Sequence, residues 1–163
     1  MKRYAREDQV RLAVWAADCA ERVLPYVTAD LPGDDRARYA VDTLREWVIS
    51  GVFAMRTIRG ASLGAHAAAK LVRAGSPAAL AAHAAGQAVA TAHVTQHAFG
   101  AAYYALRAIA AADPAASLAK VALERDWQIG AVAEGLRDEV RMRVALGRRG
   151  NRATVTMDKT GEF

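Results

Sequence analysis

The chain has 163 residues, of which 53% are hydrophobic and only 7% aromatic, and its formal net charge is +5. This length fits one domain with a core of small side chains, and the single cysteine, Cys19, excludes an internal disulfide and a thiolate zinc site. No segment reaches the about 20 uninterrupted apolar residues of a membrane span, and the N-terminus lacks the apolar run of a signal peptide, so we expect a cytoplasmic protein that does not enter a membrane.

Helical periodicity begins near residue 7. Apolar residues recur at i+3 and i+4 spacing through 7–28, and Pro25 is expected to kink or end this helix. Asp34 is the candidate N-cap of a second helix over 35–50, for which Gly51 supplies the stop.

The middle of the chain predicts two further helices. The first covers 53–74, where Gly60 and Gly64 would allow another helix to approach closely. The pair Ser76-Pro77, as N-cap and first helical residue, then begins a helix over 77–112.

The fold class follows from these patterns. Gly100 is the candidate break within the fourth helix, and a last helical region covers 114–146. No segment shows the alternation typical of a β-strand. We therefore predict an all-α fold, a single-domain antiparallel bundle of five to seven helices over 1–147, with a flexible basic tail at 148–163.

An alanine-rich stretch in the fourth helix holds three of the four histidines and almost no charge. Buried polar rings need partners, so these side chains predict either a hydrogen-bond network or a functional pocket. On one helix, His93 and His97 would present two ligands to one metal ion, and His66 and Asp18 could approach from other helices. The H-E-x-x-H pattern of zinc proteases is absent. We favour the hydrogen-bonded pair, because a histidine pair on an alanine-rich helix is more often a buried hydrogen-bonded pair than a metal site.

Other residues give weaker signals. Cys19 is interpreted as a small buried hydrophobe rather than a nucleophile, and no nucleophile elbow, P-loop or dinucleotide-binding motif is present. The arginines of 137–149 only hint at a nucleic-acid surface, and we do not expect nucleic acid as a partner. Trp127 is either a core anchor or an interface hot spot. The candidates for a binding surface are Asp34, Asp35, Arg38, Trp127 and Gln128.

Five segments, in this order, resemble the immunity-five-like putative immunity proteins of bacterial polymorphic toxin systems. They are WAADCAERVLPYV (15–27), DDRARYAVDTLREWV (34–48), GAHAAAKLVR (64–73), AAGQAVATAHVTQHAFGAAYYALRAIAAA (84–112) and ERDWQIGAVAEGLRDEV (124–140). The resemblance covers about 8–146. Gln87 stands where the family block often has histidine, which adds Gln87 to the pocket or metal candidates, and Ala133 stands where the family often has proline.

The resemblance implies a small helical, non-catalytic protein without a cofactor that binds and neutralises a cognate toxin. A basic chain is unsuited to a basic nuclease, so we expect an acidic target surface or a toxin that is not a nuclease. The alternative is a metal-binding helical-bundle enzyme that uses His93 and His97. The sequence leaves open whether the chain forms a homo-oligomer.

Overall fold

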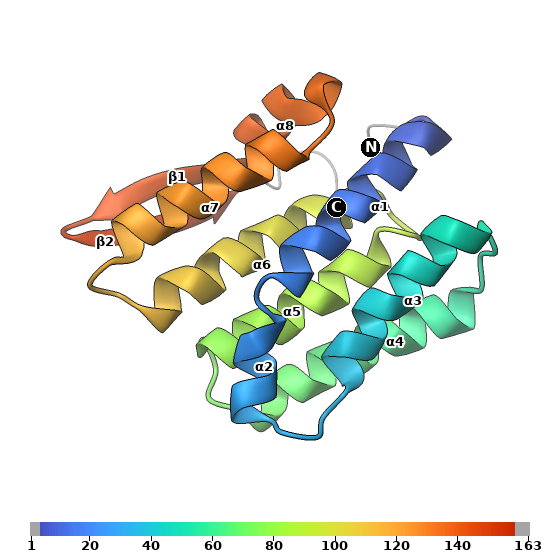
Figure 1. The fold of residues 1–163 in the computed structure, drawn as a ribbon, viewed down its shortest axis with the longest axis horizontal. Coiled ribbons are helices and arrows are strands. Elements are labelled where there is room, and N and C mark those ends of the chain that lie inside the picture. The colour runs from blue at the N-terminus through green and yellow to red at the C-terminus, as the bar shows by residue number, and fades with distance from the viewer. Residues whose placement is uncertain (1–3, 159–163) are drawn as a thin grey trace.

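The computed structural model describes residues 4–158, and Figure 1 shows a bundle of helices with a two-stranded sheet along one side. The predicted all-α fold class is confirmed, apart from this small sheet. The elements in chain order are α1 (Arg6–Glu21), α2 (Leu24–Asp30), α3 (Arg36–Ser50), α4 (Met55–Ala68), η1 (Ala69–Leu71), α5 (Pro77–Ala90), α6 (His97–Ala112), α7 (Ser117–Ala131), η2 (Glu134–Leu136), α8 (Arg137–Arg143), β1 (Val144–Arg149) and β2 (Arg152–Met157).

The signals for helix ends in the first half of the chain are largely confirmed. The periodic run 7–28 divides into α1 and α2, with Pro25 in the first turn of α2, where a proline needs no amide hydrogen. Gly51 ends α3 in the left-handed conformation, at φ 68°. The N-cap position of α3 belongs to Asp35, while the carboxylate of Asp34 accepts a hydrogen bond from the backbone N–H of Arg36 at 3.1 Å.

Helix α5 lies at the centre of the bundle and contacts α1, α2, α3, α4 and α6. Most of its side chains are buried alanines, which allow several helices to pack around one axis. The large side chains of the core come from elsewhere. Trp15 packs edge-on against Phe99 with ring centroids 6.3 Å apart, and its indole N–H donates to the carbonyl oxygen of Gln128 at 2.9 Å.

Close contact at glycine occurs at other positions than we expected. A Cβ atom at Gly60 would have no atom within 4 Å, and at Gly64 it would meet only the Arg36 side chain, at 3.9 Å. A Cβ atom on Gly86 would lie 2.8 Å from the ring of His66, and one on Gly100 would lie 2.6 Å from the side-chain oxygen of Gln87. The prediction for Gly60 and Gly64 is therefore wrong, and among the glycines within helices the contacts that require glycine lie on α5 and α6.

The predicted helix over 77–112 breaks at residues 91–96 and not at Gly100, which lies inside α6. A side chain from α1 stabilises this break. The amide nitrogen of Gln9 donates to the carbonyl oxygens of Thr91 at 3.1 Å and Ala92 at 3.2 Å. These carbonyl groups have lost their helical partners, so a distant residue satisfies them.

The described part of the chain ends in a β-hairpin, so the expectation that no segment forms a strand is wrong. Strands β1 and β2 pair antiparallel, and the tight turn between them holds Gly150 at φ 61°. The predicted boundary between the helical domain (1–147) and the tail (148–163) falls within β1, and residues 159–163 lie outside the described range.

Buried side chains of α7 attach this hairpin to the bundle. The guanidinium of Arg125 donates to the carbonyl oxygens of Val140 at 3.0 Å and Val144 at 2.5 Å. The hydroxyl of Ser117 accepts a hydrogen bond from the amide of Ala153 at 3.0 Å. Over the described range 4–158, no helix has the length and apolar character required to cross a bilayer.

Candidate functional site

A pair of half-buried histidines, His66 and His83, links α4 to α5. The Nδ1 atoms of His66 and His83 lie 2.8 Å apart, so one ring donates a hydrogen bond and the other accepts it. The ring of Tyr104 on α6 lies 5.2 Å from that of His83. This geometry requires an unprotonated acceptor nitrogen, so both rings cannot be cationic while the bond exists.

A second pair links α5 to α6. The Nδ1 atom of His97 lies 2.8 Å from the side-chain oxygen of Gln87, so the imidazole donates and the amide oxygen accepts. Gly100 leaves the space that the Gln87 side chain occupies. The glutamine at this position therefore serves as a hydrogen-bond acceptor between two helices.

The environment of these rings keeps them neutral at pH 7. Burial, together with the nearby His83, His97 and Lys70, lowers the pKa of His66 to about 4. Burial and the charge of Arg107 lower the pKa of His83, and burial also lowers that of His97. A ring with a pKa of about 4 is a weak proton acceptor at neutral pH, so this network has the character of a structural one.

The spacing that predicted a metal pair does not exist in the folded chain. His93 lies in the turn before α6, exposed, with its ring stacked on Phe53 at a centroid distance of 6.3 Å. His97 is the first residue of α6, so the two histidines do not share one helix. Within residues 4–158, no group of three or more His, Cys, Asp or Glu side chains is placed to hold a metal ion.

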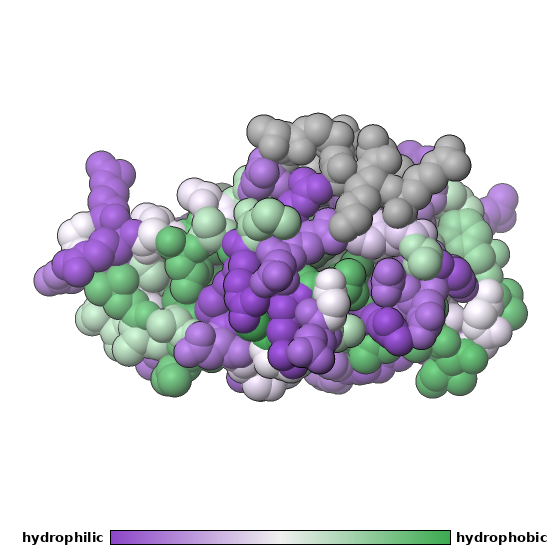
Figure 2. Space-filling view, turned by 90° about the horizontal axis from the view of Figure 1, so that it is seen from above, coloured by the Kyte–Doolittle hydropathy of each residue, from purple (hydrophilic) through white to green (hydrophobic). Residues whose placement is uncertain are grey.

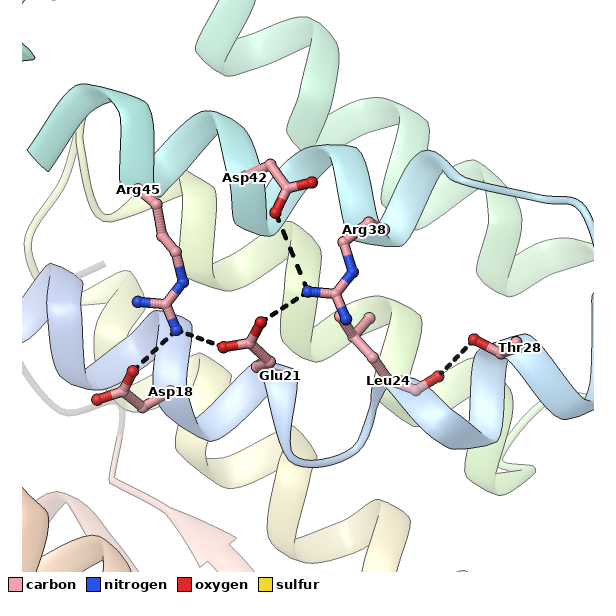
Figure 3. Close-up of polar contacts among 7 residues, drawn as sticks. All are labelled: Asp18, Glu21, Leu24, Thr28, Arg38, Asp42 and Arg45. Atoms are coloured by element: carbon pink, nitrogen blue, oxygen red, sulfur yellow. Dashed lines mark hydrogen bonds and ion pairs between the residues drawn. The ribbon is translucent and has the colours of Figure 1, made fainter. Parts of the chain in front are cut away.

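Asp18, the acidic ligand candidate, belongs to an ion-pair network between α1 and α3 (Figure 3). One nitrogen of Arg45 contacts the carboxylates of both Asp18, at 2.9 Å, and Glu21. Arg38 donates to the second oxygen of Glu21 at 2.6 Å and lies 4.0 Å from Asp42. The network joins the two helices. It engages both Asp18, the candidate metal ligand, and Arg38, a candidate for the binding surface.

The remaining candidates for a binding surface range from exposed to fully buried. Asp34 pairs with the Arg36 side chain, and Asp35 is exposed at the start of α3. Trp127 is half-buried beneath the guanidinium of Arg22, 4.0 Å from its ring. Gln128 is fully buried, and its amide donates to the carbonyl oxygen of Ala102 at 3.3 Å. The expectation that Gln128 contributes to a surface is therefore wrong.

Cys19 is fully buried, as expected of a small core residue. Burial, with the nearby carboxylates of Glu124 and Asp18, raises the pKa of its thiol well above the ordinary value. Because the thiolate is the nucleophilic form, this environment does not support nucleophilic chemistry at Cys19.

The sequence interpretation missed an exposed apolar surface where α3 ends and α4 begins. Five of the eleven large hydrophobic side chains that the described residues expose lie here, and we call them the apolar end patch: Ile49, Val52, Phe53, Met55 and Leu63. Ile49 is 85% exposed and Val52 70%. Figure 2 shows hydrophobic residues gathered at the right-hand end of the molecule, the end at which the chain passes from α3 to α4 in Figure 1.

A groove of about 380 Å³ adjoins the apolar end patch, and we call it the α4 groove. Met55 and Leu63 of the patch line it, together with Ile58, Arg59, Ala90 and His93. The stacking of Phe53 on His93 joins the loop after α3 to the rim of this groove. An apolar patch with a hollow beside it is typical of a protein–protein interaction site.

Two arginines of α4 are exposed: Arg59, which lines the groove, and Arg56, which lies three residues earlier in the same helix. In the part of the chain that the structure describes, neither forms an ion pair, whereas Arg11, Arg22, Arg36, Arg38, Arg45 and Arg141 each do. Unpaired guanidinium groups at an apolar surface offer charge-assisted hydrogen bonds to carboxylates of a partner. The sequence signal for this site was the apolar segment 48–55 around Gly51, which continues through the connection between α3 and α4, where polar residues are usual.

The structure thus defines a small helical-bundle protein with a half-buried histidine network and an exposed apolar surface beside unpaired arginines. Residues 2–134 match the family described as Imm-5 like putative immunity protein, and the chain belongs to this family. The match ends before α8 and the hairpin. No curated protein and no solved structure shows significant similarity to the chain.

Proposed function

We propose that this protein neutralises a cognate bacterial toxin by binding it stoichiometrically, without catalysis. Membership of the immunity family supports a role in toxin resistance. The observation that carries the binding mechanism is the apolar end patch beside the α4 groove. Its composition, with Phe53, Met55 and Arg59, is that of an interface core, where aromatic residues, methionine and arginine are enriched.

The charges beside the groove support an acidic partner surface. Arg56 and Arg59 have no carboxylate partner in the described residues, and the chain as a whole carries +5. A partner with an apolar side chain flanked by Asp or Glu would fill the groove and pair both guanidinium groups. Complementary charge of this kind raises the association rate and disfavours basic competitors.

The site of action that fits this role is the cytoplasm of the toxin-producing bacterium. The single thiol, Cys19, is compatible with a reducing compartment. Location and oligomeric state both stay predictions, and the proposal requires only that the apolar end patch is accessible to the toxin.

Variants of the groove test the proposal. The cognate toxin is first identified among the toxins of the source strain, as the one against which expression of this protein protects growing cells. Calorimetry then measures the Kd of the complex between the two proteins. We expect Leu63→Asp to weaken binding by at least about 30-fold, because truncated interface anchors cost about 2 kcal/mol or more. The matched control is Leu123→Asp on α7, which is 70% exposed and lies outside the patch. Equal affinity of wild type and Leu63→Asp would overturn the assignment of this surface.

The charge component has its own experiment. The double variant Arg56→Glu/Arg59→Glu should lower the association rate and weaken its dependence on salt. An association rate unchanged at low ionic strength would contradict an acidic partner surface while leaving the apolar contact intact.

A metal-dependent enzyme that uses His93 and His97 is the second candidate function, and a separate measurement addresses it. Elemental mass spectrometry of untagged protein, beside His97→Ala, measures bound metal. Near-stoichiometric metal that disappears in the variant would favour the enzyme, although His93 and His97 lie on different elements.

A further inference from the structure

A second cavity, of about 420 Å³, lies between the helical bundle and the hairpin, and we call it the hairpin cavity. Tyr103 and Arg107 of α6 line one side, and Arg152 and Thr154 of β2 line the other. Its volume is within the range of small-molecule sites. Arg152 and Thr154 lie beyond the residues that match the family, and the cavity shares no lining residue with the α4 groove, so it is independent of the toxin-binding proposal.

The lining of the hairpin cavity is cationic. It includes two arginines and no aspartate or glutamate. The nearest carboxylate in sequence, that of Asp113, is occupied by Lys120 at 2.9 Å and by the backbone amide of Ala116 at 3.1 Å. Within the described residues, neither Arg107 nor Arg152 forms an ion pair.

The hairpin itself places like charges together. Arg152 stands directly opposite Arg149 in the register of the two strands. Like charges at opposed positions of an antiparallel pair are destabilising, and no described carboxylate compensates them. A bound anion at Arg152 would remove this repulsion.

The donors of the cavity suit an anion with several oxygen atoms. Arg107 donates to the hydroxyl oxygen of Tyr103 at 3.0 Å, which leaves the Tyr103 proton and the remaining guanidinium protons for a ligand. Arg152 adds donors from the facing strand, where Thr154 also lines the cavity. Leu80, Ala110 and Val155 supply an apolar wall beside them.

We propose that the hairpin cavity binds a phosphate monoester, with the phosphate between Arg107 and Arg152 and the organic body on the apolar wall. A phosphate carries about two negative charges at pH 7 and three acceptor oxygens, which match the two guanidinium groups and the Tyr103 hydroxyl. The benzoate ion has one charge and two oxygens on a similar apolar body, so it serves as the comparison ligand.

Calorimetry at constant ionic strength, with phenyl phosphate as the probe, tests the proposal. We expect saturable binding that weakens at least about tenfold in Arg152→Gln, the loss of one charge-assisted contact. The matched control is Arg11→Gln, an exposed arginine of α1 outside the hairpin cavity, whose affinity should equal that of wild type. Benzoate should bind more weakly than phenyl phosphate.

The variant Arg107→Gln and the pKa of His83 provide two independent tests of the same site. Arg107→Gln should also weaken binding, and circular dichroism confirms that each variant is folded. Because Arg107 lowers the pKa of His83, an anion beside Arg107 should raise that pKa in an NMR titration. Unchanged affinity in Arg152→Gln, the absence of saturation, or equal binding of benzoate would each overturn the phosphate site.

Discussion

The close contact between Gly86 and His66 predicts that Gly86→Ala lowers the stability of the protein, whereas helix propensity alone predicts that it raises the stability. An alanine Cβ at position 86 would lie 2.8 Å from two atoms of the His66 ring and 3.0 Å from its Nδ1. The ring would have to move, and its hydrogen bond to His83 would be lost. We therefore expect Gly86→Ala to destabilise the protein, although alanine is the better helix former.

The magnitude follows from three contributions. Extra volume in a packed interior costs about 1–3 kcal/mol, and a lost hydrogen bond costs about 0.5–1.5 kcal/mol. Replacing a mid-helix glycine by alanine stabilises by about 1 kcal/mol. The net loss is about 2 kcal/mol, which lowers the Tm of a chain of this size by roughly 4–8 °C.

Thermal unfolding followed by circular dichroism at pH 7.5 measures the effect, and Gly60→Ala is the matched control. Gly60 also lies inside a helix, but a Cβ there meets no atom within 4 Å, so this substitution should raise the Tm. The double variant Gly86→Ala/His66→Ala removes the clashing ring and should lose less than the sum of the two single variants. A Tm raised equally by Gly86→Ala and Gly60→Ala would refute the contact.

Three further predictions concern the interior. Stability should fall as the pH falls from about 6.5 to about 4, because His66 is protonated in the unfolded chain over this range but stays neutral in the folded protein, where its pKa is about 4. The ring is partly exposed, which limits the loss to between about 1 and 3 kcal/mol. Urea unfolding at pH 7 and pH 4.5 measures this loss, and the same pH dependence in His66→Asn as in wild type would contradict it. Arg125→Met removes the donors to Val140 and Val144, so we expect a loss of about 3 kcal/mol and faster amide exchange in β1 and β2 than in α5; unchanged exchange in the strands would count against this anchor. Cys19 should not react with a thiol reagent in the native protein and should react fully in denaturant, whereas rapid native reaction would show that the thiol is not buried as described.

Local signals predicted much of the bundle because they act within one turn of chain. Ser76 accepts the amide of Ala79 at 3.2 Å ahead of Pro77, and Gly51 ends α3 as a left-handed cap. Such signals need no knowledge of distant residues. The break at 91–96 could not be found in this way, because Gln9, more than eighty positions away, satisfies the freed carbonyl groups.

The hairpin and the candidate site show the same limit. Strand β1 follows α8 without a turn signal, and the buried Arg125 on α7 fixes its position. The histidine stretch predicted either a hydrogen-bond network or a pocket. The hydrogen bonds of His66, His83 and His97 join three helices, so the i, i+4 spacing suggested a false pair. The apolar end patch is a property of exposure, which only the folded arrangement shows.

The most direct test of stoichiometric, non-catalytic neutralisation is a titration of purified cognate toxin with this protein, followed through the residual toxin activity. Binding predicts a linear decrease that reaches zero at a fixed molar ratio of the two proteins and does not change with incubation time. In the same titration, Leu63→Asp should require a large excess and Leu123→Asp should behave as wild type. Complete, time-dependent loss of toxin activity at a small fraction of one equivalent would contradict the account and establish catalysis instead.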